Sequence, residues 1–158
     1  MDGVKPIQTP ISTSGDISYD RSTLLTDATE YRSIVGSLQY LTFTRPDLAY
    51  VVNKVCHFMH APTVFHWSLV KRILRYLKNT STFGILLRPY PSLQLSFSAY
   101  VDSDWAGSLE DRRTSGYCIF LGGNIISWSA RKQKKISRSS TEAEYRGLAI
   151  ATAEIMWI

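Results

Sequence analysis

The sequence predicts an α+β fold in which a small helical subdomain is followed by three antiparallel strands and a further helix. Apolar residues recur every three or four positions between residue 27 and about residue 80, as in helices, and alternate with polar residues after it, as in strands. A third observation is Gly122-Gly123-Asn124, which favours a tight hairpin turn because Gly adopts positive φ angles without steric cost. We therefore expect a helical segment over residues 27–80 and a strand-rich domain over residues 81–158.

Residues 1–26 have no apolar period and are rich in Ser, Thr, Pro and Gly. Such a composition buries too little apolar surface to order itself. We expect a disordered leader there.

Three amphipathic helices are expected between residues 27 and 79. The first begins at a capping box formed by Asp27 and Glu30 and continues for about 14 residues. The second restarts at Arg45-Pro46-Asp47, because Pro suits the first turn of a helix, and the third begins at Thr63. The predicted inward faces are Leu48, Val51, Val52, Val55 and Met59 in the second helix, and Val64, Trp67, Val70, Leu74 and Leu77 in the third.

The opposite face of the third helix is basic and consists of Lys71, Arg72, Arg75 and Lys78. One interpretation is that these cations follow the phosphates of a nucleic acid. The other is that they form an ordinary solvated face near a helix C-terminus, where cations are favoured. The sequence supports both equally.

Strands are predicted over residues 93–102, 115–121 and 125–130, followed by a helix from about residue 141 that Ser139-Ser140-Thr141 caps. Leu93, Leu95, Phe97, Ala99 and Val101 share one parity, which is expected to face the core. Asp102 then stands where the first strand leaves that core. It is a candidate metal or acid/base residue because it is accessible to solvent and held by a rigid element, although Asp is also common in turns.

Acidic residues in the first turn of the last helix can face Asp102, and Glu142 and Glu144 are the candidates. Carboxylates that converge repel one another unless a divalent cation offsets their charge, and ligation by oxygen alone suits Mg²⁺ or Mn²⁺. For Glu142 the alternative is electrostatic capping of the helix.

The formal net charge of +5 makes a polyanion a plausible partner. The sequence contains no apolar run of about 18 residues and opens with no signal peptide, so we expect an intracellular protein without a membrane partner.

Several segments together resemble the Pol polyprotein of copia-type retrotransposons at the junction of reverse transcriptase and ribonuclease H. The segments that resemble the connection after reverse transcriptase are residues 31–41 (YRSIVGSLQYL), 44–47 (TRPD) and 72–78 (RILRYLK). Those that resemble the ribonuclease H part are 102–107 (DSDWAG), 115–117 (SGY), 127–129 (SWS) and 137–145 (SRSSTEAEY). The resemblance covers nearly the whole chain after residue 27, and the segments occur in the same order as in the family.

The resemblance implies a ribonuclease H-like fold in which two Mg²⁺ ions flank the scissile phosphate of the RNA strand in an RNA–DNA hybrid. By position, Asp102 and Glu144 match the catalytic, metal-binding carboxylates, and Asp104 and Glu142 are neighbours with which the assignment can exchange. The ions activate a water and stabilise the leaving oxygen. Lys132, Lys134, Lys135 and Arg138 would contact the phosphates, and Lys71, Arg72 and Arg75 are further candidates for this role.

In the family, a further strand with a catalytic aspartate follows this helix, whereas no Asp follows Asp111 here. We therefore expect a truncated ribonuclease H-like domain, from a fragment of a plant transposon open reading frame, that is inactive alone and self-associates through the open edge of its first strand. The rest of the Pol polyprotein is then an expected partner. The alternative is a nucleic-acid-binding remnant without catalysis.

Overall fold

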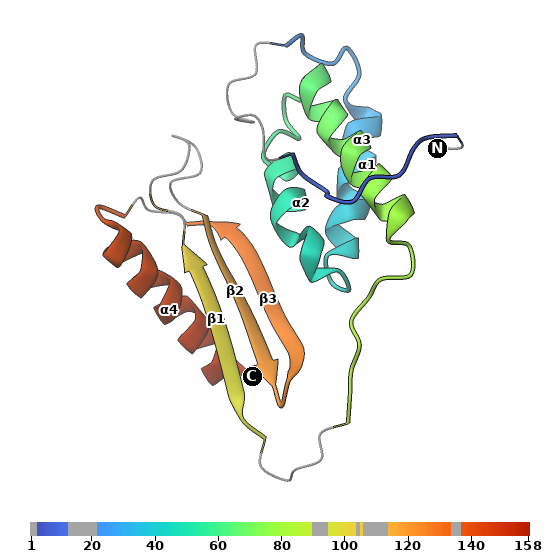
Figure 1. The fold of residues 1–158 in the computed structure, drawn as a ribbon. Coiled ribbons are helices and arrows are strands. Elements are labelled where there is room, and N and C mark those ends of the chain that lie inside the picture. Colours follow the sequence, from blue (N-terminus) through green and yellow to red (C-terminus); the bar gives the residue numbers. More distant parts are fainter. Residues whose placement is uncertain (1–2, 13–21, 90–94, 104, 106–113, 134–136) are drawn as a thin grey trace. The chain divides into compact units, whose positions relative to one another are not determined.

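The computed structural model describes residues 3–12, 22–89, 95–103, 105, 114–133 and 137–158. Three helices are followed by a three-stranded antiparallel sheet and a last helix, so the predicted α+β class is confirmed (Figure 1). The chain forms two compact units, Met1–Gly84 and Ile85–Ile158. No helix in the described part of the chain is long and apolar enough to cross a membrane.

The helical unit contains α1 (Thr29–Leu41), a 3₁₀ turn (Pro46–Leu48), α2 (Ala49–Cys56) and α3 (Val64–Asn79). The predicted capping box at the start of α1 is wrong. Ala28 occupies the cap position without a side-chain hydrogen bond, and Asp27 Oδ1 instead accepts from the amide of Thr29 at 2.8 Å. The helix begins one residue later than the sequence pattern indicates, because the short Asp side chain forms a local turn before it.

The core of this unit contains residues from all three helices, among them Val35, Val52, Val70 and Ile73. The predicted inward face of α2 is confirmed from Leu48 to Val55. Met59 lies beyond the end of α2 and is only partly buried against the core.

The predicted inward face of α3 is confirmed for Val70, which is buried, and for Trp67, Leu74 and Leu77, which are partly buried against the core, but it is wrong for Val64. The buried residues of α3 are His66, Val70, Ile73 and Tyr76, whereas Val64 is 54% exposed. His66 is buried because its Nδ1 accepts from the amide of Thr63 at 3.1 Å and its ring stacks on Phe58. A pattern of apolar residues counts His as polar. It therefore does not predict the burial of His66, whose Nδ1 has a hydrogen-bond partner in the helix cap.

Arg45 joins the loop before α2 to the C-terminal end of α3. The buried guanidinium donates to both carboxylate oxygens of Asp47, at 2.9 and 2.7 Å, and to the carbonyl and hydroxyl oxygens of Thr80, at 2.9 and 2.8 Å. Tyr76 also donates to Asp47, at 2.8 Å. The hydrogen bonds from Arg45 hold the pKa of the Asp47 carboxyl below its ordinary value.

The second unit contains β1 (Phe97–Ser103), β2 (Thr114–Leu121), β3 (Asn124–Lys132) and α4 (Ser140–Trp157). The strands lie in the order β1-β2-β3, and both pairs are antiparallel. Gly122 and Gly123 have φ angles of 55° and 88°, so the predicted hairpin is confirmed. Residues 93 and 94 of the predicted first strand lie outside the described residues.

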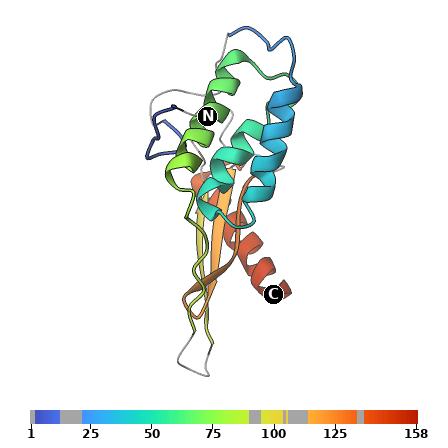
Figure 2. The ribbon, with the colours of Figure 1, turned by 90° about the vertical axis from the view of Figure 1, so that its right-hand side faces the viewer.

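Helix α4 packs on one face of this sheet (Figure 2). Its buried residues are small and one turn apart, namely Ala143, Gly147 and Ala151. They let the helix approach the strands closely. The predicted core parity of β1 is confirmed only at Val101, which is half-buried and faces α4. Leu95, Phe97 and Ala99 share its parity but are exposed.

Candidate functional site

Asp102 lies one residue before the end of β1, opposite Gly116 of β2. Its neighbours Val101 and Ser103 face α4, because a Cβ atom on Gly147 would lie 2.6 Å from Val101 Cγ1 and from Ser103 Oγ. Asp102 therefore projects from the face of the strand opposite α4, where it is exposed, so a residue of α4 can share an ion with it only around the open edge of β1. The carboxylate is accessible to solvent and carried by a hydrogen-bonded strand.

The two glutamates at the start of α4 have different roles. Glu142 Oε2 accepts from the amide of Arg138 at 2.7 Å, and Glu142 Oε1 pairs with Arg146 at 2.6 Å. The hydrogen bond from Arg138, followed by the charge of Arg146, lowers the pKa of Glu142. The Ser139 hydroxyl completes the helix start by accepting from the amide of Glu142 at 3.1 Å. Glu142 thus caps the helix.

Glu144 is exposed, and no hydrogen bond or ion pair joins its carboxylate, or that of Asp102, to another residue of the described part of the chain. Glu144 precedes Gly147 by about 4.5 Å along the helix axis, and Gly147 contacts β1 beside Asp102. The first turns of α4 therefore lie close to the strand that carries Asp102. Among the described strands β1 is at the sheet edge, so this region can be reached from solvent.

Trp105 ties the end of β1 to the segment before α4. Its indole Nε1 donates to the carbonyl of Ser137 at 2.9 Å, and Ser137 is buried. Trp105 follows Asp102 by three residues, and Ser137 precedes the Ser139 cap by two. This hydrogen bond therefore positions the two segments that carry the candidate carboxylates. The Trp between Asp104 and Gly107 suggests an indole with a hydrogen-bond partner, but nothing in the sequence marks Ser137 as that partner.

The remaining predicted metal residue, Asp104, lies outside the described residues. The described residues contain no group of three or more His, Cys, Asp or Glu side chains that could hold a metal ion. Of the predicted metal residues, the described part of the chain thus contains Asp102, Glu142 and Glu144, and Glu142 is bound at the helix start.

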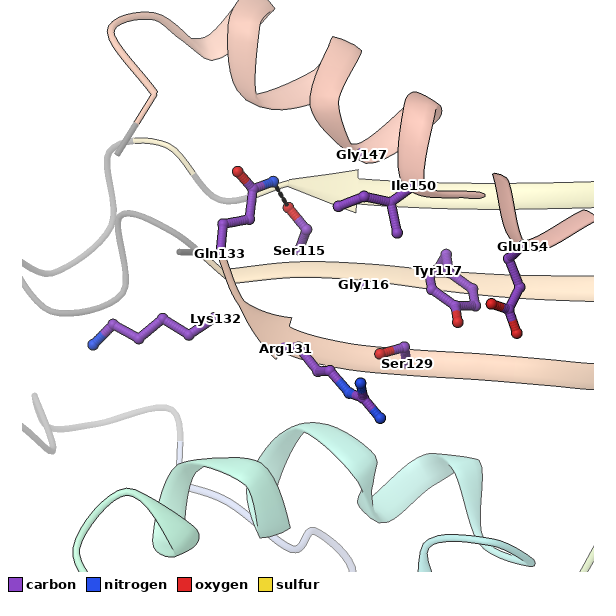
Figure 3. Close-up of a pocket in the computed structure, with 10 residues that line it drawn as sticks. All are labelled: Ser115, Gly116, Tyr117, Ser129, Arg131, Lys132, Gln133, Gly147, Ile150 and Glu154. Carbon is purple, nitrogen blue, oxygen red and sulfur yellow. Dashed lines mark hydrogen bonds between the residues drawn. The ribbon is translucent and has the colours of Figure 1, made fainter. Parts of the chain in front are cut away.

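A hollow of about 230 Å³ lies between α4 and the ends of β2 and β3 (Figure 3). Arg131 and Lys132 line it on the side of β3, and Glu154 lines it on the side of the helix. Ser115 at its rim accepts from Gln133 and contacts the hydroxyl of Ser103 at 2.9 Å. Asp102 and Glu144 do not line this hollow, so it is separate from the carboxylate pair.

The predicted phosphate-binding cations fall into two groups. Lys132 ends β3, and the exposed Arg138 stands next to the cap of α4, whereas Lys134 and Lys135 lie outside the described residues. Those of α3 already have contacts: Arg72 and Arg75 donate to the N-terminal segment, and Lys71 lies 5.5 Å from the centre of the Trp67 ring.

Comparisons with known proteins give a consistent result. The chain is 52% identical over 155 residues to the retrovirus-related Pol polyprotein from transposon RE2 of Arabidopsis thaliana, and 53% identical over 155 residues to that from transposon RE1. Each match covers 98% of this chain and 10% of the relative. An uncharacterized mitochondrial protein of the same plant, AtMg00810, is 49% identical over 97% of this chain and 63% of its own length.

This chain therefore spans about a tenth of the length of the two transposon relatives. No protein-family model matches it. No solved structure matches it either.

Proposed function

We propose that this chain, which is homologous to a region of copia-type retrotransposon Pol polyproteins, supplies two carboxylates of a ribonuclease that cuts the RNA strand of RNA–DNA hybrids. Asp102 on β1 and Glu144 on α4 are the proposed metal-binding, catalytic residues. The rest of the Pol polyprotein is the proposed partner that completes the enzyme.

The observation that carries this proposal is the difference between the two glutamates of α4. Glu142 is committed to the helix start by Arg138 and Arg146, whereas the Glu144 carboxylate is exposed one turn before the contact of α4 with β1. A helix gains from an acidic residue in its first turn, and Glu142 already fills that role. Glu144 therefore has no evident structural duty in the described part of the chain, which favours a role in binding.

Magnesium fits the chemistry of these donors. Carboxylate oxygens are its preferred protein ligands, and it commonly takes only one or two of them and completes its shell with water and phosphate oxygens. Asp102 and Glu144 would hold the ion at the edge of β1, and Trp105 would keep their segments in register through Ser137. A bound ion supplies water activation and stabilisation of the leaving oxygen.

The metal site is tested by adding Mn²⁺ to ¹⁵N-labelled chain and measuring the relaxation of each amide. We expect paramagnetic broadening around Asp102 and Glu144 at the same Mn²⁺ concentration, because one ion touches both side chains. Asp102→Asn and Glu144→Gln should each weaken Mn²⁺ binding by about tenfold, which corresponds to about 1.4 kcal/mol of binding free energy.

Glu30→Gln is the matched control, since it removes one carboxylate from the first turn of α1 in the other unit. It should leave the broadening unchanged. Broadening at only one of the two carboxylates, or a pattern that follows Glu142 and ignores Glu144, would show that the proposed pair is wrong.

A further inference from the structure

The described N-terminal segment, residues 3–12, runs antiparallel along the basic face of α3 (Figures 1 and 2). Near its start, the carbonyl of Lys5 accepts from Arg75 Nε at 2.9 Å. Near its end, Arg72 Nη2 donates to the Thr9 hydroxyl at 2.9 Å and to the Ile11 carbonyl at 3.4 Å. The segment thus binds the same arginines that the sequence offered as candidates for phosphate binding.

Apolar contacts hold this segment in place. Ile7 and Ile11 are partly buried against the core of the helical unit. Their spacing of four residues places them on either side of Thr9, which contacts Arg72. The helical unit therefore provides a binding surface for an extended peptide. Apolar side chains of the peptide pack on this surface, and the arginines of α3 donate hydrogen bonds to the peptide.

The oxygen atoms that accept hydrogen bonds from Arg72 and Arg75 on this surface are neutral. Arg45 and Arg146 are paired with the carboxylates of Asp47 and Glu142, whereas Arg32 donates to carbonyl oxygens. Within the described residues no carboxylate pairs with Arg72 or Arg75, and their partners are carbonyl and hydroxyl oxygens. The positive charge of both side chains is therefore not neutralised by the segment that covers them.

We propose that Lys71, Arg72 and Arg75 form a binding site for the phosphate backbone of a nucleic acid, and that residues 3–12 occupy this site in cis, so that leader and nucleic acid compete. Hydrogen bonds from a guanidinium to phosphate are charge-assisted and roughly twice as strong as those to neutral acceptors. A polyanion can therefore displace the leader although Ile7 and Ile11 anchor it. The choice of a nucleic acid as ligand rests on the proposed function; the competition rests on the contacts.

Deletion of residues 1–12 gives the sharpest test, because this segment contains one acidic and one basic side chain, Asp2 and Lys5, so its loss leaves the formal net charge unchanged. The probe is a short fluorescent RNA–DNA hybrid in EDTA, which removes any contribution from a metal site. We expect the deletion to tighten binding and to steepen the dependence of log K on log salt by about 2, because Arg72 and Arg75 each gain a phosphate.

Arg75→Gln in the deleted chain should remove about half of that gain. The matched control is Lys54→Gln, which removes one cation of the same unit from α2 and should leave the gain unchanged. An unchanged affinity and salt slope after deletion, in a chain whose helical content and cooperative unfolding are intact, would overturn the proposal.

A second measurement covers the case in which the deletion unfolds the helical unit. In the full chain, saturation with the hybrid should move the amide signals of Lys5, Ile7 and Thr9 to random-coil positions. Signals that keep their docked positions at saturation would show that the leader and the nucleic acid do not compete. Both measurements are made without a divalent ion, so their outcome is independent of the carboxylate pair.

Discussion

Replacing Arg45 with Ala is expected to lower the unfolding free energy of the helical unit by about 3 kcal/mol. The substitution removes four hydrogen bonds, two to Asp47 and two to the buried Thr80, whose carbonyl then accepts only from the amide of Phe83 at 3.0 Å. Asp47 is half-exposed, so its stranded charge costs less than a fully buried one would. Arg45→Lys should restore little of this free energy, because an ammonium group cannot donate to Asp47 and Thr80 in the way that the planar guanidinium does.

The measurement is native-state hydrogen exchange of core amides such as those of Val55 and Ile73, which report the opening of this unit. Lys71→Ala is the control, since it removes an exposed cation of the same unit and should change the free energy by less than about 0.5 kcal/mol. Equal effects of both substitutions would contradict the role of Arg45.

The cluster of Arg45, Asp47 and Tyr76 also determines how the stability of the helical unit changes at acid pH. The folded-state pKa of Asp47 lies below its unfolded value, which is about 3.9. The carboxylate therefore stabilises the unit above about pH 4, and this contribution is lost as the pH falls through the lower folded-state value. Exchange in an Asp47→Asn chain should lack this part of the acid dependence.

Gly147→Ala is expected to destabilise the second unit by about 1–3 kcal/mol. The new methyl group would lie 2.6 Å from Val101 Cγ1 and from Ser103 Oγ, so α4 or β1 must shift. The shift would also move Glu144 away from the strand that carries Asp102, and Mn²⁺ binding should weaken together with stability.

Gly36→Ala is the matched control, because Gly36 also lies inside a helix but has no heavy atom within 4 Å of the added Cβ. This substitution should stabilise the helical unit by about 1 kcal/mol, since Ala has the higher helix propensity. Hydrogen exchange in each unit distinguishes the two cases. An equal gain from both substitutions would show that α4 does not approach β1 as described.

The elements that the sequence predicted well are those with one dominant local signal. Gly122 and Gly123 required a turn with positive φ angles, and that requirement determined which strands pair. The helix starting near Ser139 followed from a polar cap before an apolar run. Neither depended on contacts with distant residues.

The predictions were wrong or incomplete where a distant or polar partner determines whether a side chain is buried and what it contacts. His66 and Tyr76 are buried in α3 because Thr63 donates to His66 Nδ1 and Asp47 accepts from the Tyr76 hydroxyl, and a pattern of apolar residues does not show such partners. In the same way, the arginines of α3 were open to two interpretations because the period of α3 contains no sign that residues 3–12 fold back onto it. The pairing of Trp105 with Ser137 spans 32 residues, so no local pattern indicates it.

The most direct test of the central claim is the affinity of the chain for an RNA–DNA hybrid in Ca²⁺, which takes the same oxygen ligands as Mg²⁺, compared with EDTA. We expect the cation to tighten binding in the unaltered chain and in Glu142→Gln, and we expect Asp102→Asn and Glu144→Gln to reduce this effect sharply. Neither variant should lower the affinity in EDTA, because each loses a negative charge that repels the phosphates. A cation effect of equal size in all four proteins, or none in the unaltered chain, would contradict a metal site formed by Asp102 and Glu144.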